Sequence, residues 1–274
     1  MMTIDNVDNA LRDAYLPVIA NRLNNCDLFI ARVEKTTRDV YGKEVFVNIE
    51  FREDKFHTLK ANLATFSVEF LFSDKAIRAC KNSAAAFAEL VNDEVTATIA
   101  FTEDRIRNVV YGDEIVPNFI GLKEFFTKGE SCSRWTPRSF GCKGYDFEYI
   151  KNLIDNENPD IDTMICSPST KRKFIDSNSN ANINIIENLN GRKSVAFVDN
   201  ILMLTYKYMA DDEIWFVNSR DFKFHQLCDW RWVEDENGKI LKKDEDKGLW
   251  KATLIKYVNL MCHNPGEQIR IRIK

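Results

Sequence analysis

The side chains best suited to chemistry in this 274-residue sequence are three histidines and seven cysteines. Histidine supplies general bases and metal ligands, and cysteine supplies nucleophiles and metal ligands. A metal site or catalytic triad would need His57, His225 and His263 to converge, or one of them to meet a nucleophile and a carboxylate. The three lie in different predicted elements, His57 at a hairpin tip and His263 in a turn. We therefore expect no histidine-based site.

The cysteines also carry no recognisable site. They are odd in number and none forms a C-x-x-C pair, so neither a disulfide framework nor a zinc module is indicated. This usage fits a reducing compartment, and no glycine-rich phosphate loop, H-E-x-x-H or calcium-loop pattern is present. We predict no catalytic, cofactor-binding or metal-binding residues. The cysteines are Cys26, Cys80, Cys132, Cys142, Cys166, Cys228 and Cys262.

Charged clusters offer surface chemistry instead. Three acidic runs, 211–213, 234–236 and 244–246, are typical of solvated turns, and we assign them no role. Two basic groups, Lys171-Arg172-Lys173 and Arg270, Arg272 and Lys274, could contact DNA phosphates or acidic neighbours, although solvated faces are favoured. Six aromatic residues fit an interface or plain core packing equally well. They are Trp215, Phe216, Phe222, Phe224, Trp230 and Trp232.

The composition is that of an ordinary globular protein, with 45% hydrophobic and 29% charged residues. A net charge of -4 argues against a protein that binds nucleic acid electrostatically, because neutralising phosphates needs a basic surplus. The first residues lack the features of a signal peptide, and no apolar run approaches the roughly 18 residues of a membrane span. We expect a soluble chain with protein partners and no membrane.

Residues 73–112 are predicted to form one long helix, around which the other elements are arranged. Apolar side chains recur there every three or four residues, Ser73 and Asp74 provide an N-cap, and Gly112 can end the helix. Such a helix would be about 50 Å or longer. The weakest point is Asn82-Ser83, where a kink can form.

The segments before this helix contain few core-sized residues. Residues 5–35 predict two short helical pieces with a bend at Leu16-Pro17, which would not fold alone and would lie along something else. Residues 45–51 and 65–72 alternate apolar and polar side chains and predict a long, projecting β-hairpin. Such a hairpin is marginally stable alone and needs a partner surface.

The second half predicts a mixed α+β module. We expect a short apolar element at 119–126, a loop at 129–144, helices at 145–156 and after Ser167, and strands at 161–166, 195–198, 201–204 and 214–217. Strands 230–233 and 239–241 flank Asn237-Gly238, a strong hairpin signal. Two further alternating strands are expected at 250–260 and 269–273.

In this order, the elements resemble the major capsid proteins of tailed bacteriophages, which have the Johnson fold. The resemblance covers nearly the whole chain and is carried by short sequence words in a fixed order. They are YLPVIANRLNN with VEK (15–35), VYGKEVFVNIEF (40–51), SDKAIRACKNSAAAFAELVNDE to RNVVYGD (73–113), GLKEFF (121–126), DTMICSPS (162–169), DEIWFVNSRDFKF (212–224) and WKATLIKYVNLMCHNPGEQIRI (250–271).

The resemblance implies an α+β fold in five parts. These are an N-terminal arm (1–36), an E-loop hairpin (37–72), a P-domain spine helix (73–117), an A-domain (118–220) and strands that return to the P-domain (221–274). It implies a structural protein and not an enzyme. Copies would join as pentamers and hexamers into an icosahedral shell around double-stranded DNA, in the virion after assembly in the host cytoplasm.

The resemblance also implies partners. They are other copies of the chain, a separate scaffolding protein, a portal protein, DNA bound without sequence specificity and, in some relatives, a decoration protein. Some relatives crosslink a hairpin lysine to an asparagine of a neighbour; Lys55, Lys60, Asn259 and Asn264 are conceivable here, but no motif fixes a pairing. The alternatives are an encapsulin-type compartment and a cytosolic α+β enzyme.

Overall fold

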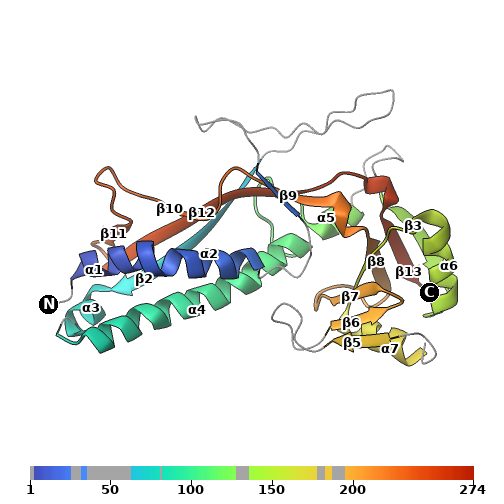
Figure 1. The fold of residues 1–274 in the computed structure, drawn as a ribbon, viewed down its shortest axis with the longest axis horizontal. Coiled ribbons are helices and arrows are strands. Elements are labelled where there is room, and N and C mark those ends of the chain that lie inside the picture. The colour runs from blue at the N-terminus through green and yellow to red at the C-terminus, as the bar shows by residue number, and fades with distance from the viewer. Residues whose placement is uncertain are drawn as a thin grey trace, which may run out of the picture.

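The computed structural model describes residues 3–25, 32–35, 63–80, 82–127, 136–177, 183–186 and 195–274. They form two lobes that lie next to each other along the longest axis of the molecule (Figure 1). One lobe is elongated and combines a long helix with a six-stranded sheet, and the other is built on a seven-stranded sheet. The predicted α+β class is confirmed.

The elongated lobe takes its elements from both ends of the chain. They are α1 (Ile4–Asn9), a π-helical turn (Ala10–Tyr15), α2 (Leu16–Asn25), β1 (Arg32–Lys35), β2 (Ala64–Ser73), α3 (Asp74–Cys80), α4 (Ala84–Tyr111), β9 (Phe222–Gln226), β10 (Arg231–Trp232), β11 (Leu241–Asp244) and β12 (Leu249–Cys262). A short helix, α5 (Leu122–Thr127), follows α4 toward the other lobe (Figure 1).

The second lobe contains most of the middle of the chain. Its elements are β3 (Arg138–Cys142), α6 (Phe147–Glu157), β4 (Thr163–Cys166), α7 (Pro168–Ser177), β5 (Ile183–Ile186), β6 (Val195–Val198), β7 (Ile201–Thr205), β8 (Glu213–Val217) and β13 (Ile269–Ile273). Two 3-10 turns, η2 (Ser219–Asp221) and η3 (Pro265–Glu267), connect β8 to β9 and β12 to β13, and so join the lobes.

Strand β12 is the central strand of the elongated lobe. One edge pairs with the whole of β2, from Leu249 opposite Ser73 to Val258 opposite Ala64. The other edge pairs in succession with β11, β10 and β9. The strand therefore has both edges hydrogen-bonded and runs along the lobe toward the second one (Figure 1).

The predicted hairpin at Asn237-Gly238 is wrong in its pairing. The turn exists, since the Asp235 N–H donates to the Lys239 carbonyl at 2.8 Å and Gly238 has a φ of 74°. However, β10 and β11 both pair with β12 and not with each other. The residues between them leave the edge of β12 and return to it, because pairing with a long, buried strand satisfies more backbone groups than a two-stranded ribbon.

The predicted helix over 73–112 is divided into two. Helix α3 ends at Cys80 and α4 begins at Ala84, because Ser83 adopts extended backbone and its hydroxyl accepts the Ala86 N–H at 3.2 Å as an N-cap. The break thus falls at the predicted weak point. The predicted end is confirmed, since Gly112 has a φ of 91°. With 28 residues, α4 is about 42 Å long.

Gly112 and Gly121 meet where the chain turns back after α4. A Cβ placed on Gly121 would lie 2.5 Å from the Gly112 Cα, which is closer than real contacts allow. Only glycine fits both positions. This close approach directs the following α5 toward the second lobe.

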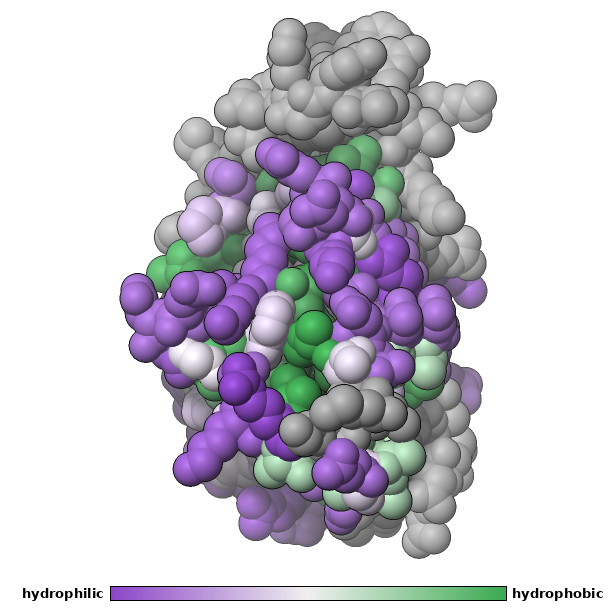
Figure 2. Space-filling view, turned by 90° about the vertical axis from the view of Figure 1, so that its left-hand side faces the viewer, coloured by the Kyte–Doolittle hydropathy of each residue, from purple (hydrophilic) through white to green (hydrophobic). Residues whose placement is uncertain are grey.

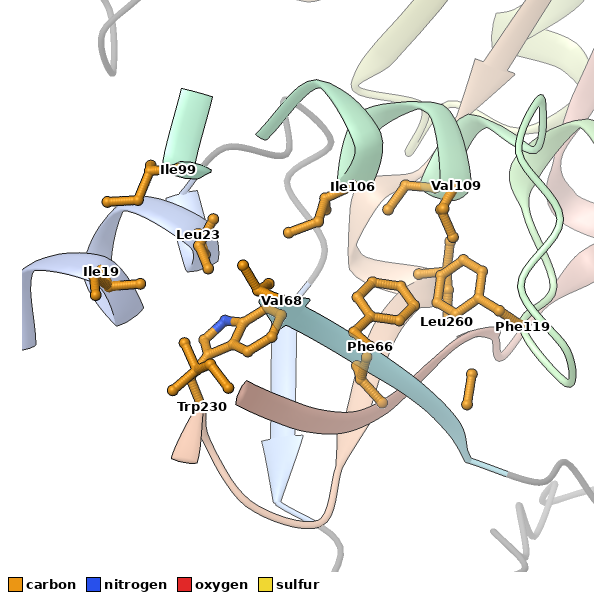
Figure 3. Close-up of a cluster of buried hydrophobic side chains, with 14 of the residues drawn as sticks. Ile19, Leu23, Phe66, Val68, Ile99, Ile106, Val109, Phe119, Trp230 and Leu260 are labelled. Carbon is orange, nitrogen blue, oxygen red and sulfur yellow. The ribbon is translucent and has the colours of Figure 1, made fainter. Parts of the chain in front are cut away.

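The main core lies between α4, β2 and α2 (Figure 3). The predicted apolar stripe of α4 is buried, as are the alternate side chains of β2 from Ala64 to Phe72. Ile19 and Leu23 of α2 point toward Ile99 and Val68, and Trp230 closes the group (Figure 3). A second core lies in the other lobe, where α6, α7 and the sheet contribute Ile150, Phe174 and Met164.

The N-terminal segment differs from its prediction. Residues 4–25 are helical throughout, and the expected disturbance at Leu16-Pro17 occurs as the π-helical turn, because proline cannot donate to the carbonyl one turn earlier. Val7, Leu11, Ile19 and Leu23 are buried in the chain's own main core. The surface along which this segment was expected to lie is therefore the core of its own chain and not a neighbouring copy. The predicted hairpin falls largely on residues 36–62, which lie outside the described residues; its second strand is β2.

The loop predicted for 129–144 is wrong where β3 forms. Residues 138–142 form β3, which pairs in parallel with β13. Strand β3 is an edge strand of the sheet, whose order is β3-β13-β8-β4-β7-β6-β5. The segment has only two large apolar side chains, so a single-sequence pattern does not reveal it. The strands predicted at 161–166, 195–198, 201–204, 214–217, 250–260 and 269–273 are present as β4, β6, β7, β8, β12 and β13, and β4 begins two residues later than predicted.

A buried carboxylate attaches the N-terminal helices to the sheet. Asp8 Oδ1 accepts the backbone N–H groups of Ile240 at 2.9 Å and of Leu241 at 3.1 Å. Arg12 adds a bond to the Gly238 carbonyl at 2.5 Å and an ion pair with Glu234. The segment is thus held by specific polar contacts in addition to its apolar face.

Replacing Asp8 by alanine should lower the free energy of unfolding by about 2 kcal/mol, because two buried amides lose a charged acceptor. Urea unfolding of the purified chain measures this loss. Asp5→Ala is the matched control: Asp5 forms only an exposed pair with Lys239, so a loss under about 1 kcal/mol is expected. Equal effects of the two variants would contradict the assigned role of Asp8.

Candidate assembly surface

The structure brings two of the three histidines together. The rings of His225, on β9, and His263, after β12, stack with centroids 5.8 Å apart and an interplanar angle of 22°. This corrects the expectation that they stay separate. His57 lies outside the described residues. Within the described ranges, no three His, Cys, Asp or Glu side chains gather in a way that could hold a metal ion.

Two of the predicted surface charges instead form a buried ion pair. Arg270 of β13 pairs with Glu213 of β8, and their side chains are 12% and 13% exposed. Glu213 also accepts the Trp215 indole N–H, while Arg270 donates to the Phe126 carbonyl at 3.2 Å. The solvated roles expected for these two residues are therefore wrong. The pair fastens α5 to the second lobe.

Aromatic side chains continue this joint between the lobes. Phe126 of α5 stacks on Trp215 of β8 at 4.8 Å, and its neighbour Phe125 meets Phe222 of β9 edge-on at 5.4 Å. Helix α5 thus contacts both lobes through adjacent residues. Five of the six aromatic residues singled out from the sequence are buried, and Phe224 is partly buried, so core packing explains them.

A tyrosine ties the end of α4 to the second lobe. Tyr206 stacks on Tyr111 at 4.1 Å and donates its hydroxyl to Asp113 Oδ2 at 2.6 Å. Burial raises the pKa of Tyr206, and the bond to the Asp113 carboxylate raises it further. The hydroxyl therefore stays protonated as a donor at every physiological pH.

Polar side chains fill the two short connections between the lobes. Asp221 of η2 accepts bonds from the side chains of Asn264 at 2.7 Å and Gln268 at 2.9 Å. Burial raises the pKa of Asp221, and these two donors oppose that rise. Gln268 also accepts the Asn218 N–H at 2.9 Å. The connections are thus cross-linked by hydrogen bonds at both ends.

The two asparagines considered for a crosslink are already engaged. The buried Asn259 carboxamide donates to the Asn118 carbonyl at 2.9 Å and accepts the Ile120 N–H at 3.3 Å. Asn264 donates to Asp221. Lys55 and Lys60 lie outside the described residues.

The surface feature that remains unexplained by packing within the chain is a set of exposed hydrophobic side chains. Hydrophilic residues frame a small strip of hydrophobic ones at the end of the elongated lobe where α1 and α3 lie (Figure 2). Elsewhere, Phe101 of α4 is 73% exposed and Ile115 is 90% exposed. Sequence analysis missed both residues. Phe101 lies off the apolar stripe of α4, and this position in the sequence could have indicated that it is exposed. No described helix is long and apolar enough to span a membrane.

Solved structures with the same fold are subunits of closed particles. The SrpI encapsulin of Synechococcus elongatus PCC 7942 is 11% identical, with a TM-score of 0.61 over 99% of this chain and 95% of that one. This chain has the Johnson fold. The capsid of the native GTA particle is 11% identical, with a TM-score of 0.57 over 91% and 90% of the two chains. The capsid of cyanophage A-1(L) is 11% identical, with a TM-score of 0.55 over 89% and 86%.

No protein-family model and no curated protein matches the sequence. The Johnson fold is therefore recognised from the path of the backbone, along nearly the full length of both chains. The resemblance to capsid proteins that the sequence words suggested is confirmed at the level of the fold.

Breaking the buried ion pair in the joint should be costly. Arg270→Met should lower the free energy of unfolding by about 3–5 kcal/mol, because the Glu213 carboxylate then stays buried without a counter-charge. Chemical denaturation measures the loss, and the double variant with Glu213→Leu should recover most of it. Arg107→Met, which breaks an exposed pair with Asp104, should cost under about 1 kcal/mol. A similarly small loss for Arg270→Met would refute this account of the joint.

Proposed function

We propose that this chain is the structural subunit of a closed protein shell, a major capsid protein whose pentamers and hexamers enclose phage double-stranded DNA. The observation that carries the proposal is the likeness of nearly the whole chain to shell subunits, with the joint and both lobes present in one chain. A shell subunit contacts several neighbours at once and therefore needs its two lobes held together. The hydrogen-bonded, aromatic joint holds them.

The surface charge is consistent with a shell that encloses DNA without binding its phosphates. Helix α4 has no lysine or arginine between Ala84 and Asp104, whereas Glu89 and Asp93 are exposed on it. Phosphate binding needs clustered cations, so this long face would repel DNA. Confinement inside a shell needs no such contact. A separate scaffolding protein and a portal protein belong to the same proposal, with a decoration protein as a further partner in some shells.

A second candidate is an encapsulin-like compartment that holds protein cargo. It is favoured by the encapsulin match, in which 99% of this chain is covered at a TM-score of 0.61. The two candidates share the shell and differ in its contents. The contents are therefore what an experiment must identify.

We expect the purified chain, alone or co-expressed with a scaffold, to form closed particles of uniform size in negative-stain electron microscopy. Particles from infected or producing cells should carry nuclease-protected DNA if the chain is a capsid protein. A protein cargo without nucleic acid would favour the compartment. Size-exclusion chromatography with light scattering provides the second measurement. A monomer under all conditions, including with candidate scaffolds, would refute the proposed function.

A further inference from the structure

Among the described residues, strand β2 has a strand partner on one edge only. Its pairing with β12 directs the backbone groups of alternate residues toward β12, and those of Thr65, Ser67, Glu69 and Leu71 away from it. The Leu71 N–H confirms this direction, since it donates to Glu94 Oε1 of α4 at 3.0 Å. Within the part of the chain that the structure describes, the backbone groups of Thr65, Ser67 and Glu69 have no hydrogen-bond partner.

In the described part of the chain, this edge lacks the usual protection against strand addition. Proteins block open edges with lysine, proline, bulges or a covering element. Between Thr65 and Glu69 there is no lysine or proline, and the side chain of Glu69 is already paired with Lys251 across the sheet. Only the Leu71 end is capped, by Glu94. The open stretch is therefore five residues long and centred on Ser67.

Exposed apolar side chains flank the same edge. Ile115 lines a hollow of about 170 Å³ together with Thr65, Ser67 and Arg105. Phe101 lies on α4 one turn before Arg105 and one turn after Thr98, which bonds to Glu94. Leu71, on β2 itself, is 43% exposed at the other end of the edge. Apolar contact area and unpaired backbone thus occur together.

We propose that this edge is a binding surface for a second copy of the chain, whose own β2 pairs with it antiparallel about Ser67. The pairing would set Ser67 opposite Ser67 and Thr65 opposite Glu69, so that no like charges meet. A two-fold contact requires such self-complementarity. The inference deepens the proposed function, on which it rests, by naming one contact between subunits.

The charges around the edge favour this partner over nucleic acid. The one basic side chain lining the hollow, Arg105, is held by Glu114 at 2.5 Å. A nucleic acid would need several free cations, whereas a strand needs only backbone groups and apolar side chains. The six backbone hydrogen bonds of three facing residue pairs would then be satisfied between copies.

Hydrogen–deuterium exchange tests the pairing directly. In assembled particles or dimers, the amides of Thr65, Ser67 and Glu69 should exchange at least about 100-fold more slowly than in the dissociated chain, because each gains an acceptor. The amides of Phe66 and Val68, which face β12 in both states, provide the internal control. Particles in which these three amides exchange freely would overturn the inference and leave the proposed function standing.

Ser67→Pro tests the same contact by mutation. Its N–H makes no bond to β12, so proline removes only the donor offered to the partner. Association measured by sedimentation velocity should weaken at least tenfold, while Ser67→Thr, which keeps the N–H, should associate as the parent does. Circular dichroism checks that both variants fold. If Ser67→Pro misfolds, Phe101→Ser with Ile115→Ser takes its place, and unchanged association would count against the surface.

A cysteine at the centre of the pairing tests its symmetry. Facing hydrogen-bonded residues have Cα atoms about 5.5 Å apart, which a disulfide spans. Under mild oxidation, Ser67→Cys should give a linked dimer, and Asn92→Cys, on an exposed part of α4, should not. A linked dimer without closed particles would support the contact and refute the shell. Absence of the Ser67→Cys dimer would refute the two-fold pairing.

Discussion

The structure depends on the pairing of both edges of β12. This strand lies between segments that are far apart in the sequence, with β2 (64–73) on one side and β9, β10 and β11 (222–244) on the other. Its side chains also face the core that α4 and α2 cover. Because a one-residue slip would turn every side chain to the other face, burial fixes its register along the whole lobe. The sheet therefore fixes the position of the long helix, and the helix in turn covers the sheet.

The same strand continues into the joint. After Cys262 the chain passes through η3 into β13, the strand that pairs with β3 and β8 in the other lobe. A displacement of one lobe is thus passed to the other through a covalent connection of a few residues. The Phe126–Trp215 stack and the bond from Arg270 to the Phe126 carbonyl, with Arg270 held in place by Glu213, resist relative rotation there, because interfaces of this kind have discrete packed arrangements.

Local patterns predicted the elements, whereas long-range pairing decided where they join. The period of α4, the alternation of β2 and the glycine at 112 were sufficient, since each reflects burial on one face or a special backbone angle. The β3 strand, the flanks of Asn237-Gly238 and the burial of Glu213 were not predictable. In each case the deciding partner, β13, β12 or Arg270, is distant in the sequence. The exposed Phe101 was missed because one apolar residue off a stripe looks unremarkable until the surrounding surface is known.

The burial of the N-terminal helices changes how assembly has to be understood. An arm without core contacts would gain all its order from neighbours, so that folding and assembly would be one event. Residues 4–25 instead fill the core of their own chain and are fastened by Asp8. Under the proposed function, the subunit would then fold first and associate afterwards, through a few exposed apolar side chains and the β2 edge proposed above. Weak contacts of that kind are reversible singly and become stable only when many of them close an array. In a shell of the proposed kind, this order would allow misplaced subunits to leave before the shell is complete.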